Sequence, residues 1–157
     1  MGHVVIETLI VAPREVVFDL ARDVSAHTRS AAFSRERAVA PGRTSGLLEL
    51  GDTVTFEGSH FFLRLRITAR IVEFDRPRSF TDELVRSAFR TLRHVHEFEE
   101  RPGATLMRDT LDWVSPLGIL GRLADALFVT GHMRRFVTRK QLALKEMAEG
   151  DGRPESA

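Results

Sequence analysis

Two histidines and one aspartate are the residues of this chain whose spacing points most directly to chemistry. His94 and His96 lie in the stretch 91–99, where apolar and polar residues alternate with the period of two that is typical of a β-strand. Both imidazoles therefore point to the same, inner face of the strand. The following strand carries Asp109 on its apolar side, and a short turn centred on Pro102-Gly103 would place Asp109 directly opposite His96.

Three interpretations of His94, His96 and Asp109 stay open at this point. The first is structural, because a buried carboxylate requires a partner and a histidine provides one. The second makes the three residues the polar anchor of a largely apolar ligand cavity. The walls of that cavity would be Leu92, Trp113, Leu127 and Phe128. The third is a metal site, but zinc requires three or four ligands and no other histidine is near in the sequence. We therefore predict no metal and no cofactor.

The composition excludes several classes of function. The chain has 157 residues, the size of one domain, with 43% hydrophobic and 29% charged residues. It contains no cysteine, which excludes disulfides, thiolate catalysis and Cys-ligated zinc. No nucleophile is paired with a base, there are no paired carboxylates and no glycine-rich phosphate loop, and the absence of tyrosine removes a common proton donor. Catalysis is therefore not the leading expectation.

Charge and hydropathy indicate where the protein works and what it meets. The net charge of +1 creates no field that would gather nucleic acid. No apolar run is long enough to span a membrane, and the first residues lack the charged flank and apolar core of a signal peptide. We expect a cytoplasmic protein whose partner is a small hydrophobic molecule, with no nucleic-acid partner and no integral membrane segment. A homodimer stays open.

The hydrophobic pattern predicts the elements that would position these residues. We expect a strand at 4–11, a short helix after Pro13, a weaker helix at 23–33, strands near 53–58, 63–71, 79–86, 91–99 and 104–113, and a long helix from Leu117 to about Glu149. Strand 63–71 has one apolar and one polar face, whereas strand 79–86 is too mixed to assign faces.

Three features leave alternatives open. Leu47, Leu48 and Leu50 stand in a loop and either fill the core or form a lid over a pocket. The C-terminal helix carries two apolar stripes displaced by roughly 100°, which favours a kink at Thr130-Gly131 over a straight helix. Its basic residues Arg134, Arg135, Arg139 and Lys140 form one flank, which we interpret as solvated rather than as a surface for an acidic partner or phosphate.

The order of the elements and several short motifs resemble the START and birch-pollen-allergen superfamily, also called the polyketide cyclase/dehydrase and lipid-transport superfamily, in particular its bacterial ligand-binding group. The motifs are Ile10-x-Ala12-Pro13-x-Glu15-x-Val17-Phe18, Leu50-Gly51-Asp52-x-Val54, Ile71-x-Glu73-x-Asp75-x-Pro77-x-x-Phe80-x-Asp82, His94-x-His96-x-Phe98 and Thr105-x-Met107-x-Asp109. The resemblance covers residues 3 to 147. One departure is Leu92, where the bacterial group leads us to expect a tryptophan; the smaller side chain would enlarge the cavity.

The resemblance implies an α+β helix-grip fold, in which a curved antiparallel sheet wraps around a long C-terminal helix and two short helices follow the first strand. Residues 1–149 would form a single ligand-binding domain and residues 150–157 a disordered polar tail. The internal cavity would bind or carry a lipid, polyketide or quinone. The alternative is a cyclase or aromatase in which His96 acts as acid or base, oriented by Asp109. A further alternative is an interaction module that uses the apolar tip Phe61-Phe62 or the basic flank of the C-terminal helix.

Overall fold

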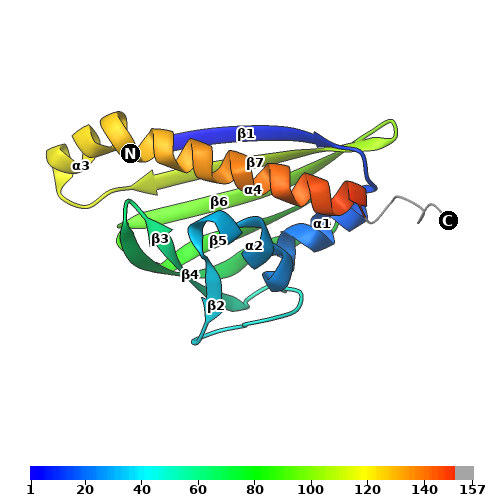
Figure 1. The fold of residues 1–157 in the computed structure, drawn as a ribbon, viewed down its shortest axis with the longest axis horizontal. Helices are drawn as coiled ribbons and strands as arrows, with labels where there is room; N and C mark the ends of the chain where they lie inside the picture. The colour runs from blue at the N-terminus through cyan, green and yellow to red at the C-terminus, as the bar shows by residue number, and fades with distance from the viewer. Residues whose placement is uncertain (151–157) are drawn as a thin grey trace.

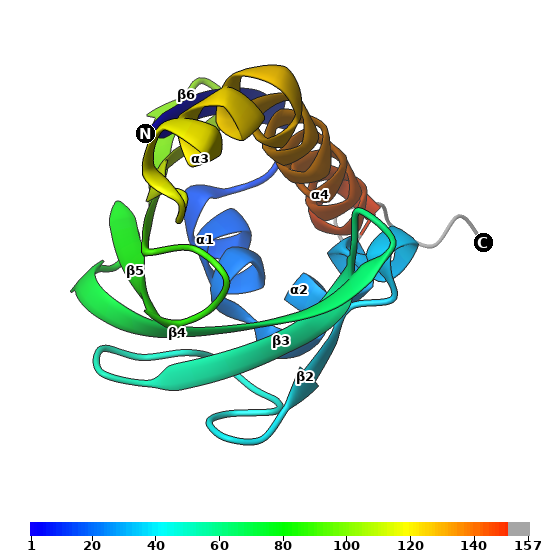
Figure 2. The ribbon, with the colours of Figure 1, turned by 90° about the vertical axis from the view of Figure 1, so that its left-hand side faces the viewer.

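A single curled antiparallel sheet grips one long helix (Figures 1 and 2). The computed structural model describes residues 1–150. The seven strands follow the order β1-β7-β6-β5-β4-β3-β2. They are β1 (Gly2–Ile10), β2 (Arg37–Val39), β3 (Thr53–His60), β4 (Leu63–Asp75), β5 (Ser79–Arg86), β6 (Thr91–Arg101) and β7 (Ala104–Val114). The helices are α1 (Arg14–Arg22), α2 (Val24–Ser30), η1 (Ala32–Ser34), α3 (Gly118–Ala124), η2 (Asp125–Val129) and α4 (Thr130–Gly150).

The predicted α+β helix-grip architecture is confirmed, with two short helices after the first strand and a long helix at the end. The short edge strand β2 was not predicted, because its three residues show no alternation long enough to detect. Of the expected polar tail, Gly150 is the last residue of α4, and the rest lies outside the described residues.

The register of the central hairpin agrees with the sequence prediction. His96 stands opposite Asp109, and Leu92 stands opposite Trp113. The hairpin turns at Pro102-Gly103, where Gly103 has φ of 68°, a left-handed conformation that favours glycine. Because the turn is short and one face of both strands is buried, a slip by one residue would expose the entire apolar set.

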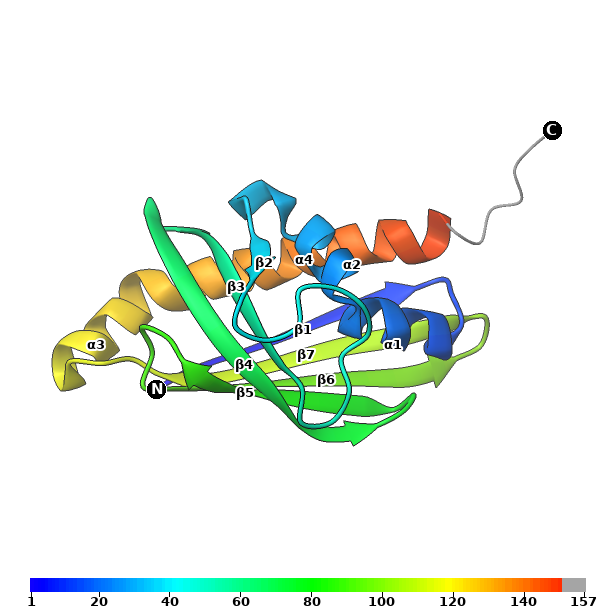
Figure 3. The same ribbon diagram turned by 90° about the horizontal axis from the view of Figure 1, so that it is seen from below.

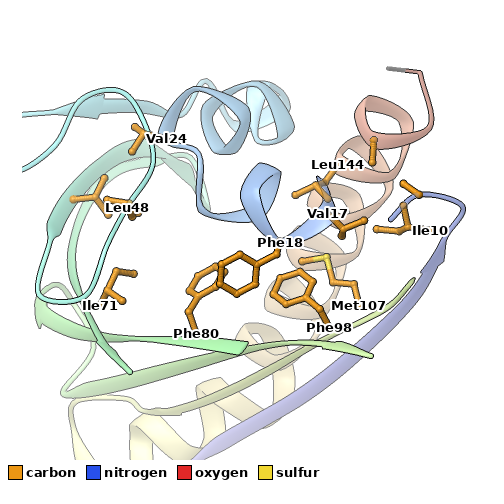
Figure 4. Packing of buried hydrophobic residues seen from close by; sticks show 13 residues of the cluster. Ile10, Val17, Phe18, Val24, Leu48, Ile71, Phe80, Phe98, Met107 and Leu144 are labelled. Atoms are coloured by element: carbon orange, nitrogen blue, oxygen red, sulfur yellow. The ribbon is translucent and has the colours of Figure 1, made fainter. Parts of the chain in front are cut away.

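Two hydrophobic clusters fill the two ends of the concave face. In the first, Phe18 from α1 contacts Phe74, Phe80 and Phe98 edge-to-face, with ring centroids 5.2–5.5 Å apart. Figure 4 shows Phe18 beside Phe80 and Phe98. The second gathers residues from β1, β6, β7 and α4 around Trp113. On β6 and β7, Phe98 and Met107 belong to the first cluster, and Leu92 and Leu111 belong to the second. The polar inner residues of these two strands lie between the clusters.

The C-terminal helical stretch is interrupted by the π-helical turn η2, which precedes Thr130. A π turn inserts one residue, and one residue corresponds to about 100° of rotation, the displacement of the two apolar stripes. The axis changes direction between α3 and α4 (Figure 2). The irregularity is therefore produced by η2 and not by Gly131, at which we expected it.

The chain from β7 to η2 is held in place by a buried carboxylate. Asp125 accepts hydrogen bonds from Trp113 Nε1 at 3.0 Å and from Ser115 Oγ at 2.5 Å. Gly121 packs directly on the preceding loop, because a Cβ atom there would lie 2.0 Å from the Pro116 carbonyl oxygen. These contacts fix α3 to the end of β7.

We expect Asp125→Ala to lower the free energy of unfolding by about 1–3 kcal/mol, because it leaves the buried Trp113 N–H without an acceptor. Urea unfolding followed by the fluorescence of the single tryptophan measures this directly. Asp112→Ala, which removes a surface ion pair with His3 from the same strand, is the matched control and should change stability by less than about 1 kcal/mol. Equal effects of the two substitutions would contradict the anchoring role of Asp125.

Candidate ligand-binding site

An internal cavity of about 140 Å³ lies between the concave face of the sheet and α4. Its size is close to that of an engineered apolar cavity that binds benzene, so it has room for one ring or a short chain. The apolar part of its wall is formed by Ala21, Leu48, Val54, Phe56, Ile67, Ala69, Ile71, Phe80, Leu92, Met107, Leu111, Met133, Phe136, Val137 and Leu144. The polar groups on this wall come in two clusters.

The first polar cluster is centred on His96, which lies between two carboxylates. Its Nδ1 is 2.8 Å from Asp109 Oδ1, and its Nε2 is 3.0 Å from Asp82 Oδ2. Burial by itself lowers the pKa of His96, but the charges of Asp109 and Asp82 outweigh it and raise the pKa to about 9. His96 is therefore a buried imidazolium at neutral pH, with both ring nitrogens directed at carboxylates.

His94 is the histidine that is available to a ligand. Its ring lies 3.8 Å from that of His96, and its Nε2 is 3.4 Å from Asp109 Oδ1, without a hydrogen-bond partner among residues 1–150. Burial and the neighbouring imidazolium lower the pKa of His94, so it is neutral. A neutral imidazole offers one donor and one acceptor. Its buried, unpaired nitrogen is a group that a bound molecule could satisfy.

Asp109 connects this cluster to α4. Gln141 Nε2 donates to Asp109 Oδ2 at 2.8 Å, and Gln141 Oε1 accepts from Thr8 Oγ1 at 2.6 Å. Burial acts to raise the pKa of Asp109, but the positive charge of His96 outweighs it and holds the pKa well below its usual range. The carboxylate therefore stays ionised and links β7 to both β1 and the long helix.

The second polar cluster comes from α2, the segment after it and α4. His27 stacks on Phe56 at 3.9 Å, and its Nε2 is 2.7 Å from Glu36 Oε1. Lys140 Nζ lies 3.0 Å from His27 Nδ1 and 2.8 Å from Nε2. Burial lowers the pKa of Lys140 against the opposing charges of Glu36, Asp109 and Asp82. The cavity thus has an amine on the helix side as well as an imidazole on the sheet side.

The predicted site residues are only partly brought together. Leu92, like the two histidines and Asp109, lines the cavity, whereas Trp113 is buried in the second hydrophobic cluster, with its indole directed to Asp125. Leu127 and Phe128 do not form a wall, which corrects our expectation: both are 62% exposed. The physical reason is η2, which contains both residues and changes the phase of the helix ahead of α4.

Lys140 is a second correction, because we had placed it on a solvated basic flank. Lys140 comes three residues after Val137 and four residues before Leu144, and both of these are buried. Because residues three and four apart share one side of a helix, this spacing already indicates that Lys140 lies on the inner face of α4. Asp82 was also missed as a site residue. It pairs with His94 in the β5–β6 register. The sequence of β5 did not show which face is the inner one, because Thr81, between the inward residues Phe80 and Asp82, is buried as well.

The loop with three leucines is tied down rather than detached from the core. Leu48 is buried in the first hydrophobic cluster and lines the cavity, and its backbone N–H donates to the Arg22 carbonyl at 3.0 Å. Arg22 Nη1 in turn donates to the Leu48 carbonyl at 3.1 Å. Leu47 and Leu50 are exposed. Leu48 therefore forms part of the wall.

Asp82, His94 and His96 also have the chemistry of metal ligands, with ligand atoms within 4.8 Å of one another. His96 Nε2 is already engaged with Asp82, so an ion would have to replace the proton between them. The expectation that the protein works without a metal stays a prediction.

Comparisons with known proteins find the same fold in solved structures. No family model matches the sequence, and a search of curated proteins finds no match. Among solved structures, a protein from Thermus thermophilus is 19% identical, with a TM-score of 0.79 over 97% of this chain and 100% of that one. The Zhui aromatase/cyclase from Streptomyces sp. R1128 is 14% identical, with a TM-score of 0.78 over 99% and 98%. Ginseng major latex-like protein 151 from Panax ginseng is 13% identical, with a TM-score of 0.64 over 94% and 97%.

This chain has the helix-grip fold, which it shares with these solved structures. The resemblance in its sequence motifs is thus confirmed at the level of the fold. No helix among residues 1–150 is long and apolar enough to cross a membrane.

The position of His96 between two carboxylates gives a test of the site. We expect Asp109→Asn to lower the pKa of His96 by about one to three pH units, because one of the two opposing charges is removed. An NMR titration of the histidine side chains measures it, with His132, which contacts His60 instead, as the internal control. A His96 that titrates identically in both proteins would show that the pair does not form.

The same pair makes stability depend on pH. The pKa of His96 is about 9 in the folded protein and roughly 6.5 in the unfolded chain, so the folded state binds more protons between these values. The stabilisation is fully present below pH 6.5 and is lost as the pH rises through 9. Urea unfolding between pH 6.5 and 9.5 should show stability falling, with a smaller slope for His96→Gln. Equal slopes would contradict the raised pKa.

Proposed function

We propose that this protein binds a small, largely apolar molecule with one or two neutral hydrogen-bonding groups in the cavity between sheet and α4, and carries it without changing it. The observation that supports this most is the neutral imidazole of His94, with its unpaired Nε2, on a largely apolar cavity wall. A ligand cavity of this kind uses many apolar contacts for affinity and a few placed polar groups for orientation. Lys140 would contact the ligand from the opposite side.

The charges around the cavity favour a neutral polar group over an acidic one. Three carboxylates, those of Asp82, Asp109 and Glu36, face at most two cations, His96 and Lys140. A further buried anion would add to the excess of negative charge without a partner, which is costly in a low-dielectric interior. A hydroxyl or a carbonyl can accept from Lys140 or exchange a hydrogen bond with His94. Phenols, quinones and short polyketides have this chemistry.

A second candidate function is catalysis of the cyclase or aromatase type, which the similarity to a solved aromatase/cyclase favours. His96 is poorly suited to act as the acid or base, because both its nitrogens face carboxylates at 2.8 and 3.0 Å. His94 and Lys140 are better placed, since both line the cavity and have lowered pKa values. A carrier and a cyclase would use the same cavity. A carrier releases its ligand unchanged, whereas a cyclase converts it.

Native mass spectrometry of the purified chain tests the proposed function directly. A co-purified molecule of one or two rings that is released intact on denaturation would support the carrier. Incubation with the recovered molecule then separates the alternatives: chemical conversion that is abolished by His94→Leu would show an enzyme and contradict a carrier.

Matched probes test the role of His94. 4-Ethylphenol joins an apolar ring to one hydroxyl, and ethylbenzene lacks the hydroxyl. We expect His94→Leu to weaken 4-ethylphenol roughly threefold to tenfold, the value of one neutral hydrogen bond, and to leave ethylbenzene unchanged or tighter. Binding is measured by calorimetry or by chemical shifts. Equal loss of both probes would mean that His94 shapes the wall without bonding to the ligand.

Leu92→Trp tests the cavity itself. The indole should fill the space beside His94, so that both probes bind at least tenfold more weakly while the thermal midpoint holds or rises. Leu9→Trp on the exposed face of β1 is the control and should leave binding unchanged. A lowered midpoint with unchanged probe binding would indicate a solid core at Leu92, since overpacking typically costs about 1–3 kcal/mol.

A further inference from the structure

Large apolar side chains are exposed at one end of the molecule, and we call six of them the apolar rim. They are Phe62 and Leu63 at the tip of the β3–β4 hairpin, and Ile119, Leu120, Leu127 and Phe128 on α3 and η2, each at least 62% exposed. Figures 1 and 3 place the hairpin tip and α3 at the same end of the molecule. Exposed apolar patches of more than a few hundred Å² mark interaction sites on proteins of this size.

The two parts of the rim are connected through the first turn of α4. The ring of Phe61, next to Phe62, lies 4.2 Å from His132, and His60 Nδ1 is 3.0 Å from His132 Nε2. Phe128 stands one turn before His132 on the same helical stretch. The rim is also held in its exposed position, because the Asp125 hydrogen bonds fix α3 to the end of β7.

Basic residues predominate around the rim, where Arg64 and Arg66 are paired with Glu57 of β3. The segments 59–66, 85–93 and 115–136 supply this end of the molecule, and their only acidic residue is Asp125, which is buried. The same segments contain the exposed arginines Arg64, Arg86, Arg90, Arg122, Arg134 and Arg135. Since the whole chain has a net charge of only +1, the positive charge is concentrated at this end.

Among the surfaces that could cover the rim, an anionic lipid bilayer fits both features. A second copy of the chain would bring arginines against arginines. A nucleic acid would use the arginines but leave the aliphatic side chains uncovered. At a bilayer, leucine and phenylalanine enter the boundary between head groups and acyl chains, while arginine pairs with the anionic head groups.

We propose that the apolar rim docks this protein on an anionic phospholipid surface, with α3 and the hairpin tip lying in the head-group region. His60, Met133 and Phe136 line the cavity and adjoin the rim in the chain, so docking would bring this end of the cavity to the bilayer. The docking surface goes beyond the proposed ligand binding and does not depend on it, because no rim residue lines the cavity.

Vesicle co-sedimentation of the full chain tests the proposal. Vesicles of equal parts phosphatidylcholine and phosphatidylglycerol should bind the protein, and vesicles of phosphatidylcholine alone should bind it at least tenfold more weakly. Raising the salt from 0.1 M to 1 M should release most of the protein, since the Debye length falls to about 3 Å. Failure of the unmodified chain to bind anionic vesicles would overturn the proposal.

Three variants separate the two contributions. Leu120→Glu with Leu127→Glu should abolish binding, whereas Leu50→Glu, a residue 63% exposed in the loop before β3, should leave it unchanged. Arg122→Glu with Arg135→Glu should weaken binding to anionic vesicles at least 25-fold, at about fivefold per basic residue removed from the surface. Thermal unfolding and 4-ethylphenol binding should be unchanged in all three variants, which keeps a failure of docking distinct from a failure of the cavity.

Two results would overturn the proposal even if vesicles bind. An equal loss in the Leu50→Glu control would mean that binding is not localised to the rim. Light scattering that shows a dimer of the unmodified chain, and a monomer for the Leu120→Glu, Leu127→Glu variant, would assign the face to a second copy of the chain instead.

Discussion

The buried imidazolium of His96 is the constraint around which the inner face of this protein is arranged. An ionised carboxylate in a protein interior is costly unless it is paired, and here two of them, Asp82 and Asp109, share one histidine. The arrangement joins three strands, because His96 is on β6 and its partners are on β5 and β7. Through Gln141 it extends to α4 and β1. The polar groups thus fix the relation between the sheet and the helix that crosses it.

The same network decides which group is left for a ligand. His96 directs both of its ring nitrogens at carboxylates. Burial and the positive charge of His96 together lower the pKa of His94 and keep that imidazole neutral. His94 is consequently the neutral one of the two imidazoles at the cavity, and its Nε2 has no hydrogen-bond partner among residues 1–150. On the opposite wall, Lys140 approaches His27, which in turn contacts Glu36. The cavity therefore has polar groups on two sides and hydrocarbon between them, an arrangement that orients a ligand without requiring it to be charged.

The fold by itself does not decide between carrying and converting a ligand. Solved structures with this architecture include an aromatase/cyclase and a major latex-like protein, at 14% and 13% identity to this chain. At such distances the likeness concerns the arrangement of sheet and helix, and function depends on the residues grafted onto it. In this chain those residues are two polar clusters in the interior and an arginine-flanked apolar rim at one end. Both are local features of the sequence placed on a common scaffold.

The sequence by itself determined every strand except β2, the inner faces of β6 and β7, and the register of the hairpin that these two strands form. Alternation in 91–99 and after the Pro102-Gly103 turn was strong enough to place His96 opposite Asp109, because a slip by one residue would have exposed every apolar side chain of both strands. The helix-grip architecture followed from the order of the elements together with the motifs that resemble the superfamily. These are properties of periodicity and of short turns, which are local along the chain.

Only the tertiary structure decided which side chains from distant segments meet. Asp82 reaches His96 through a neighbouring strand whose own pattern is mixed, and Lys140 reaches the cavity because α4 turns that face toward the sheet. Leu127 and Phe128 looked like core residues from their hydrophobicity, yet the π turn at η2 leaves them exposed. Periodicity specifies a face for each element, whereas the surface that this face meets depends on crossing geometry and helix phase, and these are set by the packing of the whole chain.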